Sequence, residues 1–288
     1  MWKGSVVAEQ REKYLFGIDL DGTLLNPAGA VSDRTKAAIH AVLKAGHKVA
    51  FATGRNYIEA REIFEIVGHH DLAVLVSGAI VVDTRARQTV HRSTMDPTLA
   101  GELCAAIESL GHAAVALQDR QHAGLDYLVS EGRNVHESLS SWLTLSGQIL
   151  ERRPKLADED HTHTLRVSTV LDYAPAAELM AVVEKDFGRR AYVHGIVVAS
   201  DGVEIIEMFD PLVNKWLGLK RVADHHGVSH ERIVAIGDDM NDLAMIEQSK
   251  FGIAMGNART DVKNVAKRTI GSNADDGLAE FLEEWLNT

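Results

Sequence analysis

The sequence predicts a doubly wound α/β core, in which helices cover both faces of a parallel β-sheet, interrupted by an inserted α+β domain. Three observations predict this fold class. Short apolar runs alternate with helix-forming segments in the first third of the chain. The alternation returns in the last third, whereas the middle of the chain has a different order of segments. Repeated strand–helix units are typical of parallel sheets, because each helix carries the chain back to start the next strand.

The first third of the chain predicts strands that are buried on both faces. Tyr14–Asp19 is mostly apolar, as expected for a central strand of a parallel sheet. Ser32 and Gly46 are a suitable cap and terminator for a helix over Asp33–Ala45. The elements that follow are a strand at Lys48–Ala52, a helix at Tyr57–Val67, a strand at Leu72–Val76 and a hairpin around Ile80–Val82 and Thr89–His91.

The middle of the chain predicts the inserted domain, over Met95–Ser200, and residues 1–94 and 201–288 then form the core. The polar segment Ser130–Thr164 carries no predicted element. Two helices and four strands are expected elsewhere in the insertion: helices Pro97–Leu110 and Pro175–Phe187, and strands Ala113–Leu117, Tyr127–Val129, Leu165–Val170 and Tyr192–Val198.

The last third of the chain completes the predicted core. Its expected elements are strand Val203–Met208, helix Leu212–His226, strand Ile233–Ile236, helix Asn241–Gln248, strand Phe251–Ala254, helix Arg259–Lys267 and helix Gly277–Leu286. In a doubly wound sheet, ligands bind outside the carboxyl ends of the strands. The residues that directly follow each predicted strand are therefore the candidates for a functional site.

The composition is that of a globular protein and restricts its partners. The 288 residues are 45% apolar and 25% charged, and the net charge of −11 repels nucleic acid. The single cysteine, Cys104, allows no internal disulfide and fits a reducing compartment. No apolar run approaches the roughly 20 residues that span a bilayer, and residues 1–13 lack the apolar centre of an export signal. We expect a cytoplasmic protein, a monomer or small homo-oligomer, that binds neither nucleic acid nor membranes.

The first candidate cluster follows the first predicted strand and contains two carboxylates. Asp19 and Asp21 flank Leu20 and are followed by Gly22 and Thr23. Mg²⁺ favours carboxylate oxygens, and an aspartate can also attack phosphorus to form a covalent intermediate. The second carboxylate could pass a proton to a leaving group and later take one from water. The alternative interpretation is a turn in which Asp and Gly simply end the strand.

Two further clusters and a lysine complete the set of candidates. Thr53-Gly54-Arg55 follows the second strand, where a hydroxyl and a helix N-terminus could hold phosphate oxygens, although such a sequence also commonly joins a strand to a helix. Gly237–Asp242 contains three acids, more negative charge than a partly buried site tolerates without a cation. Helix capping could account for one or two of these acids. Lys215 could neutralise phosphate and a carboxylate, or could be a solvated surface lysine.

These elements resemble the four motifs of haloacid dehalogenase-like phosphatases, in order and in spacing. The segments that carry the resemblance are Asp19–Thr23, Thr53, Lys215 and Gly237–Asp242. The insertion between the second and third motifs is similar to the cap of the Cof-type branch, which selects the substrate. The chain departs from this branch at Ser77-Gly78, where Asn-Gly is frequent, and at Trp216, where glycine is common.

The resemblance implies a role for each residue of the motifs. Asp19 would be the nucleophile and a Mg²⁺ ligand, and Asp21 the general acid and base, which also coordinates Mg²⁺ through its backbone carbonyl. Asp238 would be the remaining protein ligand, and Asp242 would support it without binding Mg²⁺ directly. The presence of Asp21 favours phosphate chemistry over dehalogenation. The residues that would hold the phosphoryl group are Leu20, Thr53, Gly54, Lys215 and Asn241.

The preferred function is a Mg²⁺-dependent phosphatase that hydrolyses a small phosphorylated metabolite, either a sugar phosphate or a phosphorylated cofactor, through an aspartyl phosphate. A phosphosugar mutase or another phosphotransferase of the same fold would instead pass the phosphate to a sugar. A non-catalytic relative would bind the ligand without turnover. The sequence lacks a G-x-x-x-x-G-K-[ST] loop and has no G-x-G-x-x-G after the first strand, which disfavours P-loop hydrolases and dinucleotide-dependent oxidoreductases.

The fourteen histidines raise the separate possibility of a zinc site. The candidate pairs are His69-His70, His161-x-His163 and His226 with His230. None of these pairs has a Cys or Glu cluster nearby at ligand spacing. Since all of them lie in polar segments, we interpret them as solvated surface residues.

Overall fold

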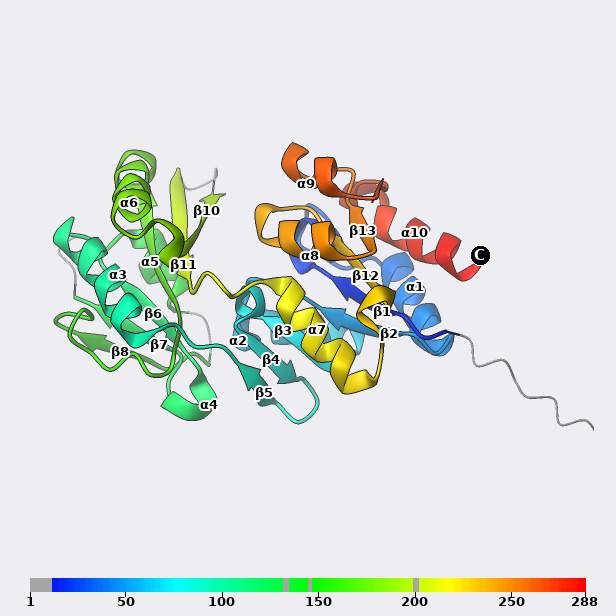
Figure 1. Ribbon diagram of the computed structural model, residues 1–288, viewed down its shortest axis with the longest axis horizontal. Helices are drawn as coiled ribbons and strands as arrows, with labels where there is room; N and C mark the ends of the chain where they lie inside the picture. The colour runs from blue at the N-terminus through cyan, green and yellow to red at the C-terminus, as the bar shows by residue number, and fades with distance from the viewer. Residues whose placement is uncertain (1–11, 132–134, 145–146, 199–201) are drawn as a thin grey trace, which may run out of the picture.

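A computed structural model describes residues 12–131, 135–144, 147–198 and 202–288. It contains a parallel five-stranded sheet, an adjoining three-stranded antiparallel sheet and a separate six-stranded sheet. Figure 1 shows the five-stranded core sheet and the three-stranded sheet in one half of the molecule, and the six-stranded sheet, called the second sheet below, in the other half. The predicted fold class, an α/β core with a second α+β part, is therefore confirmed.

The core sheet is parallel throughout, and β1 lies between β2 and β12. In spatial order its strands are β14 (Arg268–Thr269), β13 (Phe251–Ala254), β12 (Ile233–Gly237), β1 (Leu15–Ile18) and β2 (Lys48–Phe51). A single parallel bridge between Ala52 and Val74 joins β2 to β3 (Leu72–Leu75). β3 pairs antiparallel with β4 (Ile80–Asp83), and β4 with β5 (Gln88–Arg92), which confirms the predicted hairpin. The short strand β14 was not predicted.

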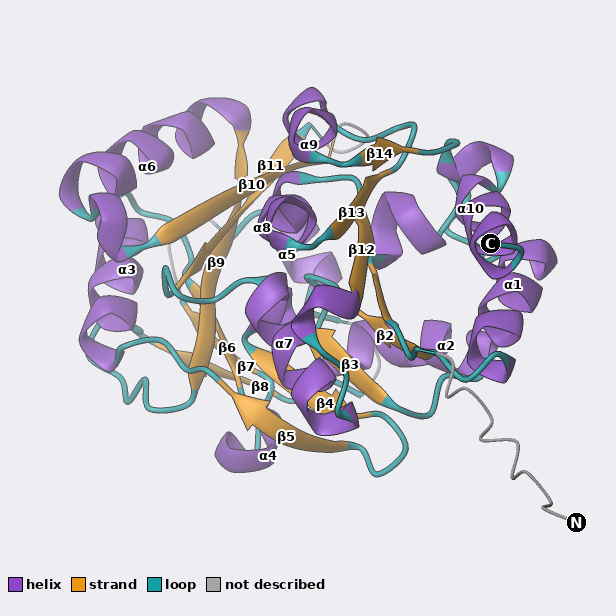
Figure 2. Ribbon diagram, turned by 45° about the vertical axis from the view of Figure 1, so that its right-hand side comes forward, coloured by secondary structure: helices purple, strands orange, loops and turns teal. Residues whose placement is uncertain are grey.

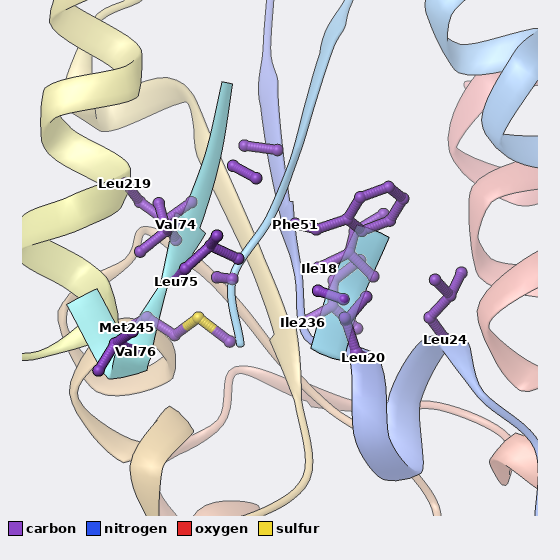
Figure 3. Close-up of a cluster of buried hydrophobic side chains, with 14 of the residues drawn as sticks. Ile18, Leu20, Leu24, Phe51, Val74, Leu75, Val76, Leu219, Ile236 and Met245 are labelled. Carbon is purple, nitrogen blue, oxygen red and sulfur yellow. The ribbon is translucent and has the colours of Figure 1, made fainter. Parts of the chain in front are cut away.

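Helices cover both faces of the core sheet, as the alternation of segments predicts. α1 (Asp33–Lys44) and α10 (Gly277–Leu286) pack together on one face, and α7 (Lys215–His226) and α8 (Leu243–Gln248) on the other (Figure 2). α2 (Tyr57–Val67) joins β2 to β3, and α9 (Thr260–Val265) joins β13 to β14. Figure 3 shows apolar side chains from both faces of the sheet filling the core, among them Ile18, Phe51, Val74, Leu219, Ile236 and Met245.

Two glycines allow α7 to lie close to the sheet. A Cβ atom on Gly17 of β1 would lie 2.4 Å from Leu219 Cδ1, and one on Gly218 would lie 2.3 Å from Val74 Cγ1. Asn214 caps α7, because its side chain accepts a hydrogen bond from Leu217 N. This close packing brings the first residue of α7 to the carboxyl end of the core sheet.

The second sheet is built mainly from antiparallel pairs, with one parallel pair. In spatial order its strands are β10 (Tyr192–Val198), β11 (Val203–Phe209), β9 (Thr164–Asp172), β6 (Val115–Gln118), β7 (Tyr127–Ser130) and β8 (Leu150–Arg153). α3 (Pro97–Ser109) and α6 (Tyr173–Asp186) cover the face turned away from the core (Figure 1). The polar segment Ser130–Thr164, for which no element was predicted, contains β8 and α5 (Glu137–Trp142), and α4 (Arg120–Ala123) is also unpredicted.

β11 belongs to the second sheet and not to the core, contrary to the prediction. We expected a core strand at Val203–Met208, but β11 pairs with β9 on one side and β10 on the other, within the second sheet. The second sheet therefore runs past Ser200, where the insertion was predicted to end. The alternation of side chains in a strand does not reveal which sheet the strand joins, because that depends on its hydrogen-bonded neighbours.

The prediction that the paired histidines are solvated surface residues is wrong for His161 and His69. His161 is buried, and its ring nitrogens lie 2.8 Å from Leu156 O and 2.9 Å from Thr164 Oγ1. His69 is also buried, against Leu72 O. Cys104 packs in the apolar core between α3 and the second sheet. Among the described helices, none is long and apolar enough to cross a membrane.

A tight turn after β3 supports the start of α7. Val76 and Ser77 adopt left-handed backbone conformations with φ of 52° and 53°, and Gly78 follows with φ of 107°. A Cβ atom on Gly78 would lie 2.1 Å from Asn214 O. The turn therefore packs against the backbone of Asn214, the residue that caps α7. Backbone atoms in this position cannot move aside without shifting the start of the helix.

Replacing Gly78 with alanine should destabilise the protein more than an equivalent change elsewhere. Gly78→Ala should lower the free energy of unfolding by about 2–4 kcal/mol, because it adds a steric clash to the cost of a positive φ. Gly29→Ala is the control, since Gly29 has a φ of 74° but nothing within 4 Å of its Cβ position. The control should lose about 1–2 kcal/mol. Equal losses in urea denaturation would show that the contact with Asn214 does not matter.

Candidate active site

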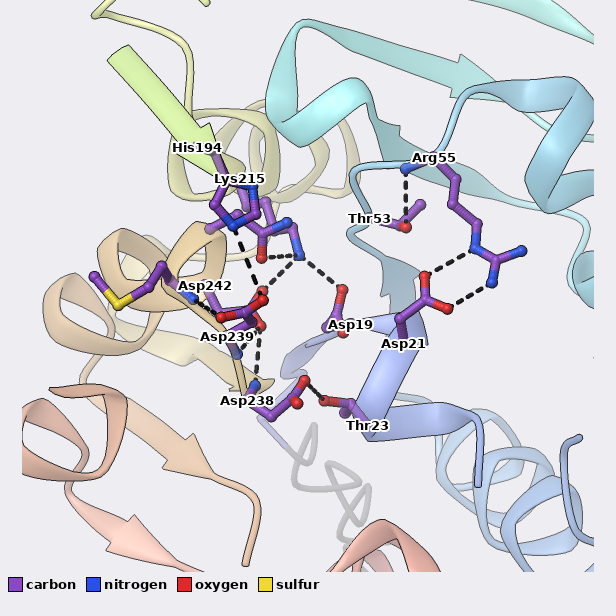
Figure 4. A network of polar contacts seen from close by, with 12 residues as sticks. Asp19, Asp21, Thr23, Thr53, Arg55, His194, Lys215, Asp238, Asp239 and Asp242 are labelled. Carbon is purple, nitrogen blue, oxygen red and sulfur yellow. Dashed lines mark hydrogen bonds and ion pairs between the residues drawn. The ribbon is translucent and has the colours of Figure 1, made fainter. Parts of the chain in front are cut away.

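The four motif segments meet at the carboxyl ends of the core strands. Asp19 follows β1, Thr53 follows β2, Asp238 follows β12, and Lys215 is the first residue of α7. Figure 4 shows their side chains directed toward a common centre. Segments far apart in the sequence converge there because the sheet is parallel, so that all strand ends of one polarity lie along one edge.

A buried ion-pair cluster forms the centre of the site. The Lys215 ammonium is completely buried and donates hydrogen bonds to Asp19 Oδ1 at 2.7 Å and to Asp242 Oδ1 at 2.6 Å (Figure 4). It also donates to Asn241 Oδ1 at 3.0 Å. The interpretation of Lys215 as a solvated surface residue is therefore excluded.

Asp242 accepts hydrogen bonds from three donors, which fix its carboxylate in the loop after β12. Its second carboxylate oxygen accepts hydrogen bonds from the backbone N–H groups of Asp238 and Asp239, at 2.9 and 3.1 Å. Gly237 is required beside it, since a Cβ atom there would lie 2.4 Å from the Asp242 carboxyl carbon. With Lys215 on its other oxygen, Asp242 shapes the loop after β12.

Asp238 lies opposite Asp19 and is tied to the turn that follows β1. Residues Leu20–Leu24 form one wide turn, and Thr23 Oγ1 donates to Asp238 Oδ1 at 3.2 Å. Gly22 has a φ of 77°, and a Cβ atom on it would lie 2.2 Å from Asp238 Oδ2. The Asn257 side-chain amide bridges Gly22 O and Asp238 Oδ2. Only glycine fits this close approach, which explains the Asp-Gly-Thr sequence.

Asp21 is held apart from the buried cluster by an arginine. Arg55 donates from Nε to Asp21 Oδ2 at 2.8 Å and from Nη2 to Oδ1 at 2.5 Å (Figure 4). The Asp21 side chain is 57% exposed, so it is accessible to solvent. The sequence indicates no role for Arg55, although it directly follows Thr53 and Gly54, because only the folded chain brings it to Asp21.

The residues expected to hold the phosphoryl group surround Asp19. Leu20 and Thr53 are buried, and the Thr53 hydroxyl accepts from Arg55 N at 3.2 Å. A Cβ atom on Gly54 would lie 3.4 Å from both Asn241 Nδ2 and Ser77 Oγ. The Ser77 hydroxyl is buried and has no hydrogen-bond partner in the described part of the chain, so it is a further donor that the sequence did not indicate.

The electrostatics of the site fit a divalent cation. Burial, followed by the neighbouring Asp242 carboxylate, raises the pKa of Asp19 well above its usual value and that of Asp238 to about 7. Burial disfavours the charge of Lys215, but Asp19 and Asp242 outweigh it and raise its pKa. One lysine therefore does not compensate the carboxylates fully.

The ligand atoms of the site point to a hard cation. Among the described residues, Asp19, Asp238 and Asp242 form a group whose ligand atoms lie within 4.8 Å of one another. All of these atoms are carboxylate oxygens, which Mg²⁺ prefers. Since Asp242 already accepts hydrogen bonds from three donors, Asp19 and Asp238 are the better placed ligands.

A cavity of about 860 Å³ opens above this cluster, between the core and the second sheet. The core contributes Asp19, Asp21, Asp238 and residues of α2. The second sheet contributes Arg166, His194 and Glu207, and α5 contributes Trp142. These four residues could not be identified from the sequence, because nothing in their spacing indicates that they share a cavity.

The fold and the site together define a doubly wound α/β protein with an acidic site at the carboxyl ends of its parallel strands. The chain matches the family model of the haloacid dehalogenase-like hydrolases over residues 16–282, and it belongs to this family. The resemblance stated from the motifs is confirmed.

Several relatives with named activities are phosphatases. One is the 5-amino-6-(5-phospho-D-ribitylamino)uracil phosphatase YitU of Bacillus subtilis, 29% identical, which spans 96% of this chain and 99% of its own. Another is the pyridoxal phosphate phosphatase YbhA of Escherichia coli, 24% identical, with 94% and 98% covered. A solved haloacid dehalogenase-like hydrolase from B. subtilis superposes with a TM-score of 0.75 at 22% identity, covering 94% of this chain and 99% of that one. The protein is a phosphoric monoester hydrolase.

Removing the Lys215 ammonium should impair catalysis strongly. Lys215→Ala should lower kcat/KM for an aryl phosphate by about 10²–10³-fold, because a preorganised positive charge beside the Asp19 carboxylate is lost. Lys220→Ala, on the same helix but partly exposed, is the control and should stay near the wild-type value. Steady-state kinetics of both purified variants make the comparison. An unchanged efficiency for Lys215→Ala would mean that its charge is not used in the reaction.

Proposed function

We propose that this protein is a Mg²⁺-dependent phosphatase that hydrolyses a small phosphorylated metabolite through a phosphoaspartate formed on Asp19. The observation that carries the proposal is the buried contact of Asp19 with Lys215 at the floor of the cavity. An aspartate held against an ammonium beside a cavity can meet a dianionic phosphate without prohibitive repulsion. The exposed Asp21 lies at the same cavity, where it can reach the leaving group.

The first half of the reaction transfers the phosphoryl group to the protein. An Asp19 carboxylate oxygen bonds to phosphorus while the bond from phosphorus to the leaving-group oxygen breaks. Asp21 gives its proton to that oxygen, so that an alcohol leaves. Lys215 stays protonated throughout and offsets the charge of the phosphoryl oxygens, together with donors from Asn241 and the Thr53-Gly54 segment.

The second half returns Asp19 to its free form. Asp21, now a carboxylate, takes a proton from water as the water oxygen bonds to phosphorus. The bond between phosphorus and the Asp19 oxygen breaks, and inorganic phosphate leaves. Arg55 keeps the Asp21 carboxylate at the cavity edge through its two hydrogen bonds, which orients the same group for both proton transfers.

Asp19 and Asp238 are the residues that would hold Mg²⁺, with Asp242 supporting the loop behind them. When bound, the cation supplies positive charge that lowers the repulsion between the carboxylates and the phosphate. The backbone carbonyl of Asp21 is the further ligand that the family resemblance implies.

The relatives support a small metabolite as the substrate. YitU and YbhA are named for a phosphorylated ribitylaminouracil and for pyridoxal phosphate, both of them phosphate monoesters of small molecules. A cavity of about 860 Å³ suits a leaving group of that size. A phosphorylated cofactor or cofactor precursor is therefore favoured within the proposed class, and a sugar phosphate is the alternative.

Metal removal should abolish hydrolysis, and Mg²⁺ should stabilise the fold through Asp238. We expect chelation to stop turnover of an aryl phosphate and Mg²⁺ to raise the midpoint of thermal unfolding, since a ligand bound only by the folded state stabilises it. Asp238→Asn should lose the Mg²⁺-dependent rise. Asp239→Asn is the matched control and should keep it. Full activity after exhaustive chelation would rule out the metal requirement.

The two aspartates after β1 should behave differently in a phosphoenzyme assay. Asp19→Asn should form no phosphoenzyme, because an amide is a poor nucleophile. Asp21→Asn should still be phosphorylated by a substrate with a good leaving group, which needs little protonation, but should hydrolyse the phosphoenzyme slowly. Rapid quenching with labelled substrate, followed by peptide mapping, should then find label on Asp19 in the Asp21→Asn variant. Label on Asp21 would contradict these roles.

A further inference from the structure

Three strands of the second sheet turn a row of polar side chains toward the active site. His194 of β10 lies directly opposite Glu207 of β11, and Glu207 lies opposite Ser168 of β9. Arg166 is two residues before Ser168, so it points to the same face of the sheet. Arg166, His194 and Glu207 line the cavity above Asp19, whereas Ser168 does not.

These polar side chains are buried but incompletely paired. Arg166, His194 and Glu207 are 2%, 5% and 5% exposed. Arg166 forms an ion pair with Glu207 and donates to Gly54 O at 3.3 Å. Within the described residues, no hydrogen-bond partner is present for Arg166 Nε, for either ring nitrogen of His194 or for Glu207 Oε2. The closest carboxylates to His194 lie 3.9 Å away, which is too far for a hydrogen bond.

Unpaired atoms of this kind are unfavourable unless a ligand completes them. A buried donor or acceptor loses its hydrogen bonds to water and needs a replacement. Burial acts to raise the pKa of Glu207, but Arg166 outweighs it and lowers that pKa, so Glu207 is an acceptor. Arg166 Nε is a donor, and a neutral His194 offers one donor and one acceptor. The set therefore presents donors and acceptors side by side.

The charge of this set suits an uncharged group. The positive charge of Arg166 is balanced by Glu207, at contact distance. Within this row of described residues, a second phosphate or a carboxylate on the leaving group would meet only a cation that Glu207 already pairs. On the core side of the cavity, Arg55 is engaged by Asp21, and Arg61 of α2 lies outside this row.

The walls beside the polar row are apolar. Ile196 and Ile205 lie directly opposite each other. Each is two residues away from His194 or Glu207 in its strand, so this pair is the next one on the same face of the sheet. Ile58 and Trp142 line the cavity from α2 and α5. The indole N–H of Trp142 donates to Glu59 at 3.0 Å, which fixes the ring and uses the Glu59 acceptor. A flat ring can pack against such walls while its edge meets the polar row.

We propose that Arg166, His194 and Glu207 form the subsite that recognises the leaving group, and that this group is an uncharged planar nitrogen heterocycle with a donor beside an acceptor on its edge. The inference rests on the proposed phosphatase function. A sugar carries hydroxyl groups around its whole rim, and those against Ile196 and Ile205 would lose their hydrogen bonds. The heterocycle places its polar atoms on one edge only, as the cavity does.

Three substrates test the subsite with the full-length protein and Mg²⁺. Pyridoxine 5′-phosphate has a planar nitrogen ring with a hydroxyl, phenyl phosphate has a planar ring without hydrogen-bonding groups, and glucose 6-phosphate has a saturated polyol. We expect kcat/KM for pyridoxine 5′-phosphate to exceed that for glucose 6-phosphate by about tenfold or more. Equal efficiencies, or a preference for glucose 6-phosphate, would overturn the heterocycle assignment.

Two isosteric variants and a matched control test the residues. Glu207→Gln and His194→Asn should each lower kcat/KM for pyridoxine 5′-phosphate by about 10–100-fold, while phenyl phosphate changes by less than about threefold. Ser168→Ala, on the same face but outside the cavity, should change neither. His194→Asn breaks no hydrogen bond among the described residues and carries the test if Glu207→Gln does not fold.

The possible failures of the test have different meanings. An equal loss on both ring substrates in the variants, with unchanged midpoints of thermal unfolding, would overturn the subsite and leave the phosphatase function intact. If wild-type protein hydrolyses all three substrates with equal efficiency, the subsite is likewise overturned and the phosphatase function stands. If wild-type protein with Mg²⁺ hydrolyses none of the three substrates, the proposed function fails and the subsite fails with it.

Discussion

The buried ammonium of Lys215 is the interaction on which the rest of the active site depends. It contacts Asp19 and Asp242, which come from two different strand ends, and without it their carboxylates would repel each other in a region that excludes water. Its position requires α7 to lie against β1 and β3, which Gly17 and Gly218 make possible. Core packing and the positive charge at the candidate active site are therefore coupled, since the same helix provides both.

The start of α2 links the active site to the second sheet. Asn56 caps α2 and donates to the hydroxyl of Tyr127 at 2.6 Å. Glu59, in the first turn, accepts from Tyr127 and from Trp142. The preceding Gly54 accepts from Arg166. The Thr53-Gly54-Arg55 segment thus sits between Asp19 and the cavity wall. A shift of the second sheet relative to the core would therefore also move the residues beside Asp19.

Much of this arrangement could be predicted because its signals are local. A buried apolar run followed by Asp-x-Asp-Gly-Thr indicates both a strand and the tight turn at its end, since Gly22 must adopt a positive φ against Asp238. The clustered acids at Gly237–Asp242 indicate a site that needs a cation. The alternation of strands and helices then predicts that these ends share one edge of a parallel sheet.

The sequence by itself determined the fold class, the family and the set of motif residues, because these depend on short-range patterns and on their order along the chain. Only the tertiary structure decided that Lys215 is buried, that Arg55 holds Asp21, and that β11 belongs to the second sheet. It also brought Arg166, His194 and Glu207 together with Trp142, from segments with no common spacing. The physical reason is that burial, ion pairing and strand neighbours are properties of contacts across the chain, and such contacts leave no periodic trace in the sequence.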